Sequence, residues 1–321
     1  DEDIKSKISL FTNVPLDAVI SAKDVDNIYE IPLGFARENL DKIILKKLNL
    51  PPKTRKLSQW KRMVEAMKNP EDEVNIALVG KYAGFQDSYL SLKQALIHAG
   101  TYHNLRVNFN WVEAEDLDGN NPEIILKDTD GILVPGGFGI RGIEGKIKAI
   151  RHAREKNIPF FGICLGMQCA SIEFARNIAG LDNANSTEFN PKTNHKIFFM
   201  WRELKGITDK GGTMRLGQYL CILKKGSLAE KAYKKLNIYE RHRHRYEFNP
   251  DYEEKMKQAG LVISGKNPEN NLVEIIELKD HPWFLGCQFH PEFKSKPLKP
   301  HPLFTAFIGA SYAYRNKKIQ H

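Results

Sequence analysis

Cysteine is scarce in this chain of 321 residues: there are four, and none lies in a Cys-x-x-Cys pair or beside a cluster of histidines. This excludes a disulfide framework and the common zinc-binding patterns, so no metal is expected. Long apolar runs are also absent, because none approaches the roughly 18 residues that a membrane span requires. The acidic start, Asp1-Glu2-Asp3, does not resemble a signal peptide. We expect a cytoplasmic protein without a membrane partner.

Blocks of like charge are missing too, although basic residues outnumber acidic ones by 48 to 39 and the formal net charge is +9. The basic residues are spread along the chain. We therefore expect a surface suited to small anionic substrates and no nucleic-acid partner. A length of 321 residues is enough for one large or two ordinary domains with a buried core.

The first chemical signal is a cysteine between a predicted strand and a predicted helix. The apolar run 158–163 predicts a buried strand, Cys164 follows it, and the apolar spacing of 167–178 predicts a helix. Gly162 and Gly166 flank the thiol as in a tight nucleophile elbow, where a Cβ would clash. The helix N-terminus would favour a thiolate. A buried structural cysteine is the alternative explanation.

A histidine at the end of a later strand makes a catalytic cysteine more plausible. The strand pattern 283–289 ends at His290, and Glu292 lies two residues further on. Residues two apart on an extended chain point the same way, so Glu292 can orient the imidazole. With Cys164 these residues form a nucleophile, a general base and an orienting carboxylate.

A glycine turn supplies the last element of the predicted chemistry. The apolar run 131–134 predicts a strand that enters Pro135-Gly136-Gly137. The backbone N–H of Gly137 can turn toward a developing oxyanion, and the amide of Leu165 is the natural second donor.

Three motifs together resemble the class I glutamine amidotransferases: PGGFG at 135–139, GICLGMQ at 162–168 and QFHPEF at 288–293. ANSTEF at 184–189, GGTMRLG at 211–217 and ERHRHRYEFNP at 240–250 are similar to one family among them, the CTP synthases. The resemblance implies that Glu188 binds the ammonium of glutamine and that Arg245 binds its carboxylate. It also places Gly137, Leu165, Gly166, Met167 and Gln168 around the carboxamide.

The resemblance also divides the chain. Residues 1–50 resemble the closing segment of a synthetase domain of the α/β class, 51–72 a linker with a helix at 57–67, and 73–321 a glutaminase domain. Lys7 would face a pyrimidine-nucleotide phosphate, and Lys23, Asp24 and Val25 would border an adenine nucleotide, although such residues in a loop are usually only solvated. The missing initiator Met and helix cap suggest that the start has been cut away.

From Val74 onward, predicted strands and helices alternate. This predicts an α/β fold with an open, mostly parallel sheet flanked by helices and a site at the carboxyl ends of the strands. Residues 137–142 satisfy GxGxxG, but they do not follow the first strand, which argues against dinucleotide binding. Residues 260–267 approximate a phosphate loop, but we expect a strand and a turn. The basic run 241–245 is predicted as an ordered loop over the pocket.

The resemblance implies hydrolysis of glutamine and transfer of ammonia to a second site, where UTP is aminated with ATP and Mg and GTP activates. The full-length protein would be a homodimer or homotetramer. The ATP- and UTP-binding half is absent, so this chain alone should not make CTP, and no cofactor is expected in the glutaminase domain. The stretch between Trp201 and Gly211, associated with the GTP response, is shorter than usual. A glutaminase that feeds another acceptor, as in GMP synthase, and a non-catalytic assembly module are the alternatives.

Overall fold

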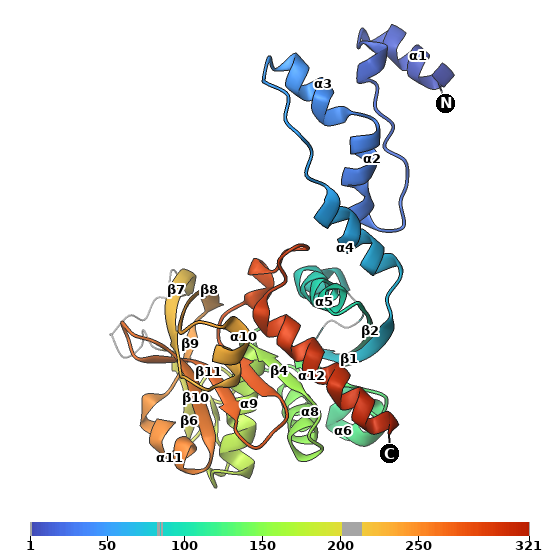
Figure 1. The fold of residues 1–321 in the computed structure, drawn as a ribbon. Coiled ribbons are helices and arrows are strands. Elements are labelled where there is room, and N and C mark those ends of the chain that lie inside the picture. The colour runs from blue at the N-terminus through green and yellow to red at the C-terminus, as the bar shows by residue number, and fades with distance from the viewer. Residues whose placement is uncertain (1, 82–83, 85, 201–213, 321) are drawn as a thin grey trace. The chain divides into compact units, whose positions relative to one another are not determined.

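The computed structural model describes residues 2–81, 84, 86–200 and 214–320 (Figure 1). The chain forms two compact units, Asp1–Asn69 and Pro70–His321. The stretch 201–211, which the resemblance associates with the GTP response, lies outside the described residues. Within the described ranges, none of the helices combines the length and the hydropathy that a membrane span requires.

The first unit is helical throughout its described part. It consists of α1 (Glu2–Thr12), α2 (Ile31–Arg37), α3 (Leu40–Lys47) and α4 (Ser58–Lys68), with single 3-10 turns η1 (Leu16–Ala18) and η2 (Ile28–Glu30). The indole of Trp60 on α4 donates a hydrogen bond to the carbonyl of Tyr29, 2.7 Å away. Helix α4 confirms the helix predicted at 57–67. The origin of this unit in an α/β domain stays a prediction.

The second unit is built on one sheet of nine strands in the order β2-β1-β3-β4-β12-β11-β10-β7-β8. The strands are β1 (Asp72–Gly80), β2 (Leu105–Glu113), β3 (Gly131–Val134), β4 (Phe160–Ile163), β7 (Arg215–Leu223), β8 (Asn237–His244), β10 (Leu261–Asn267), β11 (Leu272–Leu278) and β12 (Phe284–Cys287). From β2 to β12 neighbours are parallel, and from β12 to β8 they are antiparallel. The predicted α/β class is confirmed, with an antiparallel extension on the parallel half.

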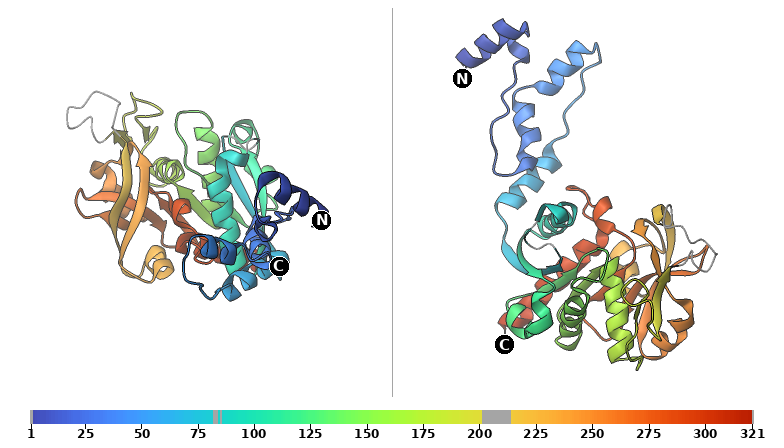
Figure 2. Two further views of the ribbon diagram at one scale, coloured as in Figure 1. Left: turned by 90° about the horizontal axis from the view of Figure 1, so that it is seen from above. Right: turned by 180° about the vertical axis from the view of Figure 1, so that it is seen from behind.

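Helices cover both faces of this sheet (Figures 1 and 2). One face carries α5 (Leu90–Tyr102), α10 (Leu228–Tyr233) and α12 (Pro302–Ile319); the other carries α6 (Asp116–Gly119), α7 (Pro122–Ile125), α8 (Ile143–Glu155), α9 (Leu165–Asn177) and α11 (Glu253–Gln258). Successive strand residues serve opposite faces, since Phe160 belongs to the core under α9 and Phe161 to the core under α12. Burial on both faces explains why the central strands β3, β4 and β12 are almost continuously apolar.

A small second sheet contains β5 (Asn185–Ser186), β6 (Lys196–Met200) and β9 (Tyr246–Phe248). Its strand β9 follows the basic run 241–245. The structure corrects the prediction that this run is a loop. Residues 241–244 are not a loop but the end of β8, in which Arg241 and Arg243 are exposed while His242 and His244 are buried. This alternation of period two is a strand signal, which the high charge of the run concealed.

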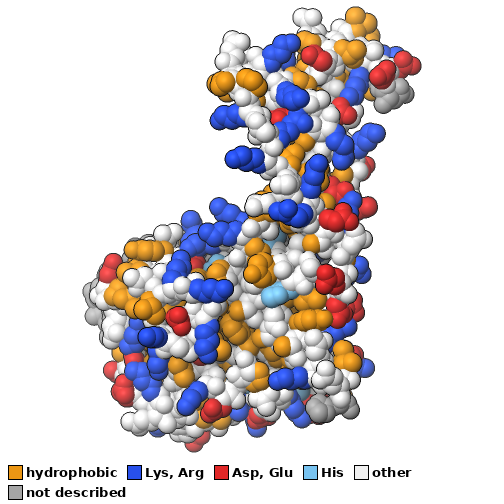
Figure 3. Space-filling model, in the orientation of Figure 1, with side chains coloured by type: hydrophobic (Ala, Val, Ile, Leu, Met, Phe, Trp, Pro, Cys, Tyr) orange, Lys and Arg blue, Asp and Glu red, His pale blue; other side chains and the backbone are white. Residues whose placement is uncertain are grey.

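The parallel pair β4 and β12 positions the site. Ile163 lies opposite Cys287 in the register of these strands, and the N–H of Cys164 donates to the carbonyl of Cys287 at 2.7 Å. The residues that follow the two strands therefore emerge side by side at the carboxyl edge of the sheet. On the face of the second unit seen in Figure 3, Lys and Arg side chains are interspersed with hydrophobic and acidic ones.

Candidate active site

Cys164 occupies a strained bend between β4 and α9. Its φ of 50° and ψ of −102° are unusual for a residue with a side chain. A Cβ on Gly166 would lie 2.1 Å from the carbonyl oxygen of Val134, and one on Gly162 would lie 2.7 Å from the carbonyl carbon of Gly166. Only glycine fits at these two positions, so the bend has the geometry that the sequence predicted for an elbow.

His290 and Glu292 are in direct contact beside this bend. The Nδ1 atom of His290 lies 2.6 Å from Oε1 of Glu292. The backbone N–H of His290 donates to the carbonyl of Arg241 at 2.8 Å, and its ring stacks on Phe293 at 5.1 Å between centroids. Burial lowers the pKa of His290, but the interactions with Cys164 and Glu292 outweigh it and raise the pKa to about 10. The interactions with Cys164 and Glu292 therefore favour the protonated form of the imidazole.

A cavity of about 260 Å³ opens over these side chains. Its walls come from the loop after β3, the elbow, the start of α5 and the segment after β12: Ser88, Tyr89, Ser91, Leu92, Pro135, Gly136, Gly137, Phe138, Ile163, Cys164, Arg243, His290, Glu292 and Phe293. A Cβ on Gly136 would lie 2.7 Å from Cε1 of His290. Glycine at 136 thus lets the loop approach the imidazole.

The two residues predicted to supply the oxyanion donors, Gly137 and Leu165, lie next to each other. A Cβ on Gly137 would be 3.2 Å from Cδ2 of Leu165, and both residues line a second hollow beside the first. Gly166, Met167 and Gln168 continue from Leu165 into the buried first turn of α9. The structure therefore brings the loop after β3 against the N-terminus of the helix that carries the thiol.

The two residues assigned to the polar end of glutamine lie at the same loop. Oε1 of Glu188 accepts a hydrogen bond from the N–H of Gly139 at 2.8 Å. The guanidinium of Arg245 lies 5.9 Å from the ring centroid of Phe138. Burial raises the pKa of Glu188, opposed by the hydrogen bond from Gly139 and by the charge of Arg245. An acidic and a basic side chain therefore flank the loop that contains Gly137.

The residues assigned to nucleotide phosphates belong to the first unit. Lys7 is exposed on α1, and Lys23, Asp24 and Val25 are exposed in the segment between η1 and η2. Their roles stay predictions.

Two features of the site were missed from the sequence. One is Gln288, whose side chain is completely buried with its Nε2 3.6 Å from Sγ of Cys164. Residues two apart on a strand share a face, so the argument that paired Glu292 with His290 also places Gln288 beside His290. The same spacing rule, applied to the residue two positions before His290, would have identified Gln288.

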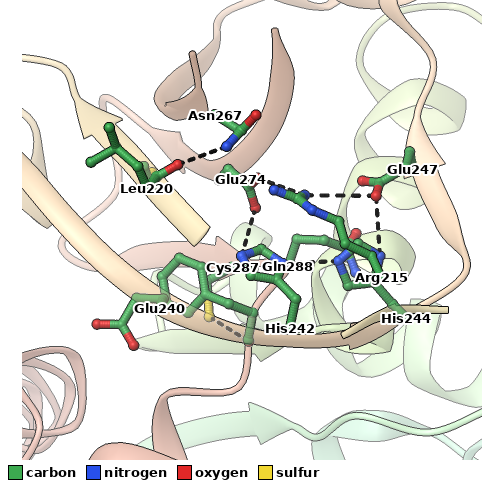
Figure 4. A network of polar contacts seen from close by, with 12 residues as sticks. Arg215, Leu220, Glu240, His242, His244, Glu247, Asn267, Glu274, Cys287 and Gln288 are labelled. Atoms are coloured by element: carbon green, nitrogen blue, oxygen red, sulfur yellow. Dashed lines mark hydrogen bonds and ion pairs between the residues drawn. The ribbon is translucent and has the colours of Figure 1, made fainter. Parts of the chain in front are cut away.

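The other is a buried network of charged and imidazole side chains behind the strands β7, β8 and β11 (Figure 4). Nη1 of Arg215 lies 2.7 Å from Oε1 of Glu274 and 3.7 Å from Oε1 of Glu247. Nε2 of His242 lies 3.4 Å from Oε2 of Glu274, and its Nδ1 lies 2.9 Å from Nε2 of His244.

In this network acidic and imidazole groups outnumber the single guanidinium of Arg215. Burial raises the pKa of Glu247 to about 8 and that of Glu274 to about 7, against the opposing charge of Arg215. Burial lowers the pKa of His244 to about 3 and also lowers that of His242. One guanidinium thus faces two carboxyl groups and two neutral imidazoles. In the part of the chain that the structure describes, no three His, Cys, Asp or Glu side chains are grouped so as to hold a metal ion.

Comparison with known proteins agrees with this geometry. Residues 85–310 match the family described as glutamine amidotransferase class-I, and residues 1–50 match the family described as CTP synthase N-terminus. A CTP synthase of Koribacter versatilis (strain Ellin345) is 56% identical over 321 residues, which cover 99% of this chain and 58% of that protein. A CTP synthase of Acidobacterium capsulatum is 58% identical over 316 residues, covering 98% of this chain and 57% of that protein.

A solved structure is similar as well. The glutaminase domain of the Trypanosoma brucei CTPS, with bound acivicin, matches with a TM-score of 0.70 and 40% sequence identity. The match covers 75% of this chain and 94% of that one. The chain therefore spans nearly all of a solved glutaminase domain, but less than three fifths of the two full-length relatives.

Proposed function

Because the chain belongs to the CTP synthase family, we propose that its second unit hydrolyses glutamine with Cys164, His290 and Glu292. In this proposal the ammonia serves the amination of UTP to CTP, an ATP-dependent step in pyrimidine nucleotide synthesis. Apart from a few candidate residues in the first unit, the machinery for that second step would lie in the part of the relatives that this chain does not span. By itself the chain carries the glutaminase half-reaction.

The single observation that supports the proposal most is the set of contacts around His290. Its Nδ1 is bound by Glu292 at 2.6 Å, and its protonation is favoured by the thiolate of Cys164. This is the arrangement of a nucleophile, a base and an orienting carboxylate. The resting site is then an ion pair in which the sulfur is ready to attack.

The reaction follows from these contacts. The thiolate of Cys164 attacks the carboxamide carbon, and the amides of Gly137 and Leu165 hold the oxyanion. When the tetrahedral intermediate collapses, the imidazolium of His290 gives its proton to the leaving nitrogen, and NH3 departs. Neutral His290 then takes a proton from water, which attacks the γ-glutamyl thioester. Glutamate leaves, and the thiolate and imidazolium are restored.

The substrate is held at its far end by opposite charges. Glu188 binds the ammonium of glutamine and Arg245 binds its carboxylate, while the backbone from Gly166 to Gln168 surrounds the carboxamide. The Nε atom of Arg245 is buried and has no hydrogen-bond partner among the described residues, which supports a role in binding a ligand anion. Acivicin, which is bound to the Trypanosoma brucei domain, should bind in the same place.

The remaining partners of the proposed enzyme are nucleotides. ATP with Mg, UTP and the activator GTP are expected for the full-length protein, which we propose to be a cytoplasmic homodimer or homotetramer. Lys7, Lys23, Asp24 and Val25 are the candidates for nucleotide contacts in this chain. No step of the glutaminase reaction proposed here uses a nucleotide or a metal ion.

The test is covalent labelling of the intact chain with 6-diazo-5-oxo-norleucine, an electrophile that mimics glutamine, followed by mass spectrometry and peptide mapping. Labelling confined to Cys164 and prevented by excess glutamine is the expected result. Cys164→Ala should abolish both labelling and glutamine hydrolysis while leaving the circular dichroism spectrum unchanged. Hydrolysis at the parental rate by this variant would refute the assignment.

A further inference from the structure

We propose that Gln288 is a further catalytic residue, whose side-chain amide donates a hydrogen bond to the sulfur of Cys164. This inference rests on the proposed function, because it gives the same thiol a second polar partner. In the proposed reaction His290 gives a proton to the leaving nitrogen and takes one from water. Gln288 carries no charge and moves no proton; it stabilises the sulfur as an anion.

The contact between the two side chains is direct and buried. Nε2 of Gln288 lies 3.6 Å from Sγ of Cys164, within hydrogen-bonding range for a sulfur acceptor. Gln288 has no exposed surface and Cys164 has 2%. A hydrogen bond to a charged acceptor is stronger where water is excluded, because the solvent offers no competing donor.

A hydrogen bond at its other end favours this orientation of the amide. Oε1 of Gln288 accepts from Nε2 of Gln168, 3.5 Å away. Since the carbonyl oxygen of the amide is engaged there, its NH2 group faces the sulfur. Gln168 lies on the first turn of α9, so the helix that begins at Cys164 also orients the amide.

The backbone around Gln288 is held on two sides. Its N–H donates to the carbonyl of Glu274 on β11 at 2.9 Å, and the preceding carbonyl, of Cys287, accepts from Cys164 at 2.7 Å. Glu274 is in turn an anchor of the buried network through its bond to Arg215 (Figure 4). The amide is therefore preorganised, and it needs no rearrangement when charge appears on the sulfur.

The chemistry of the reaction shows where such a donor matters. In the proposed reaction the sulfur is anionic when it attacks, neutral in the thioester, and anionic again when the thioester is hydrolysed. A fixed N–H favours the anionic states over the neutral one. It should keep Cys164 ionised before attack and make the thiolate a better leaving group in hydrolysis.

The test compares Gln288→Met, which is similar in length but has no donor, with Asn267→Leu. Asn267 is also a completely buried amide, which donates to the carbonyl of Leu220 at 2.9 Å and has no contact with Cys164. Iodoacetamide is used between pH 5 and 9.5, and alkylation of Cys164 is followed by peptide mapping. Burial raises the pKa of the thiols of Cys169, Cys221 and Cys287, which keeps them slow to react.

In Gln288→Met we expect the midpoint of the alkylation profile to move up by about one pH unit, so that the rate at pH 6 falls about tenfold. The plateau rate at high pH should stay within about twofold, because the sulfur itself is unchanged. Asn267→Leu should keep the wild-type midpoint. A wild-type midpoint in Gln288→Met would overturn the proposal. If that variant does not fold, Gln288→Leu replaces it, with the same two outcomes.

Glutamine hydrolysis by the same preparations separates this inference from the proposed function. A wild-type chain that hydrolyses glutamine, together with an unshifted midpoint in the variant, leaves the function standing and removes Gln288 from it. A shifted midpoint in the variant, together with a wild-type chain that 6-diazo-5-oxo-norleucine does not label, refutes the function instead. If both hold, Gln288→Met should lower kcat about tenfold with a nearly unchanged KM.

Discussion

Nδ1 of His290 and Oε1 of Glu292 lie 2.6 Å apart, so the carboxylate fixes which imidazole nitrogen faces the sulfur. Glu292→Gln keeps the shape of the side chain, but it replaces the negatively charged acceptor of the hydrogen bond from Nδ1 by a neutral amide. We expect kcat for glutamine hydrolysis to fall about 10²- to 10⁴-fold with little change in KM. Steady-state kinetics will measure both. Activity close to wild type would show that His290 is oriented by other contacts.

Arg245 should act on binding rather than on chemistry. Arg245→Ala removes the cation that we assign to the carboxylate of glutamine, and KM should rise about 10- to 100-fold while kcat changes much less. Arg241→Ala is the matched control, because Arg241 is exposed on β8, the strand that ends just before Arg245, and its backbone carbonyl is the atom that accepts from His290. An unchanged KM in Arg245→Ala would remove this residue from the pocket.

Glu247 should make stability depend on pH. Burial raises its pKa from 4.5 to about 8, so its contribution to the free energy of unfolding is fully present below pH 4.5 and is lost as pH rises through 8. Arg215 and Glu274 are the charged groups that face it, and the buried His242 and His244 stay neutral above pH 6.5.

Glu247→Gln is neutral at every pH and should escape that loss. Chemical denaturation at pH 5 and pH 9 measures the free energy of unfolding. Between these pH values the difference between variant and wild type should change by at least about 1.4 kcal/mol in favour of the variant. Glu254→Gln, on an exposed side chain of α11, should keep the wild-type pH dependence. If Glu247→Gln and wild type lose stability in parallel, Glu247 is ionised throughout.

Gly166→Ala tests the packing of the elbow. The new Cβ would meet the carbonyl oxygen of Val134 at 2.1 Å, a backbone atom that cannot turn away. We expect a loss of about 1–3 kcal/mol and a fall in Tm of about 5 °C. Gly119→Ala, where nothing lies within 4 Å of the added atom, should stay within about 0.5 kcal/mol of wild type. Equal melting temperatures for the two variants would show that the strand at Val134 moves aside without cost.

The parallel half of the fold could be predicted from the sequence largely because its inner strands β3 and β4 are buried on both faces. Such strands are short apolar runs, and the run 131–134 coincides with β3. The antiparallel half was harder, since β8 alternates arginines with buried histidines and its charge resembles that of a surface loop. Side-chain alternation, not hydropathy, carries the signal there.

The candidate site was partly predictable for a similar reason. Cys164, His290 and Glu292 are each marked by their neighbours in sequence. The contacts of Arg215 with Glu274 and Glu247 have no such local mark, because they depend on the order of β7, β11 and β9 in space. Strand order is a property of the whole fold, so this network became visible only in the structure.

The place of β12 in the sheet has a consequence for how the chain is made. β12 is the last strand to be synthesised, yet it lies between β4 and β11. At about 5–20 residues per second, the ribosome needs roughly 6 to 24 s to pass from β4 to β12. Throughout that interval the nascent chain has an apolar strand with one open hydrogen-bonding edge, which other chains can pair with. The cysteine and its base therefore come together only when β12 closes this edge.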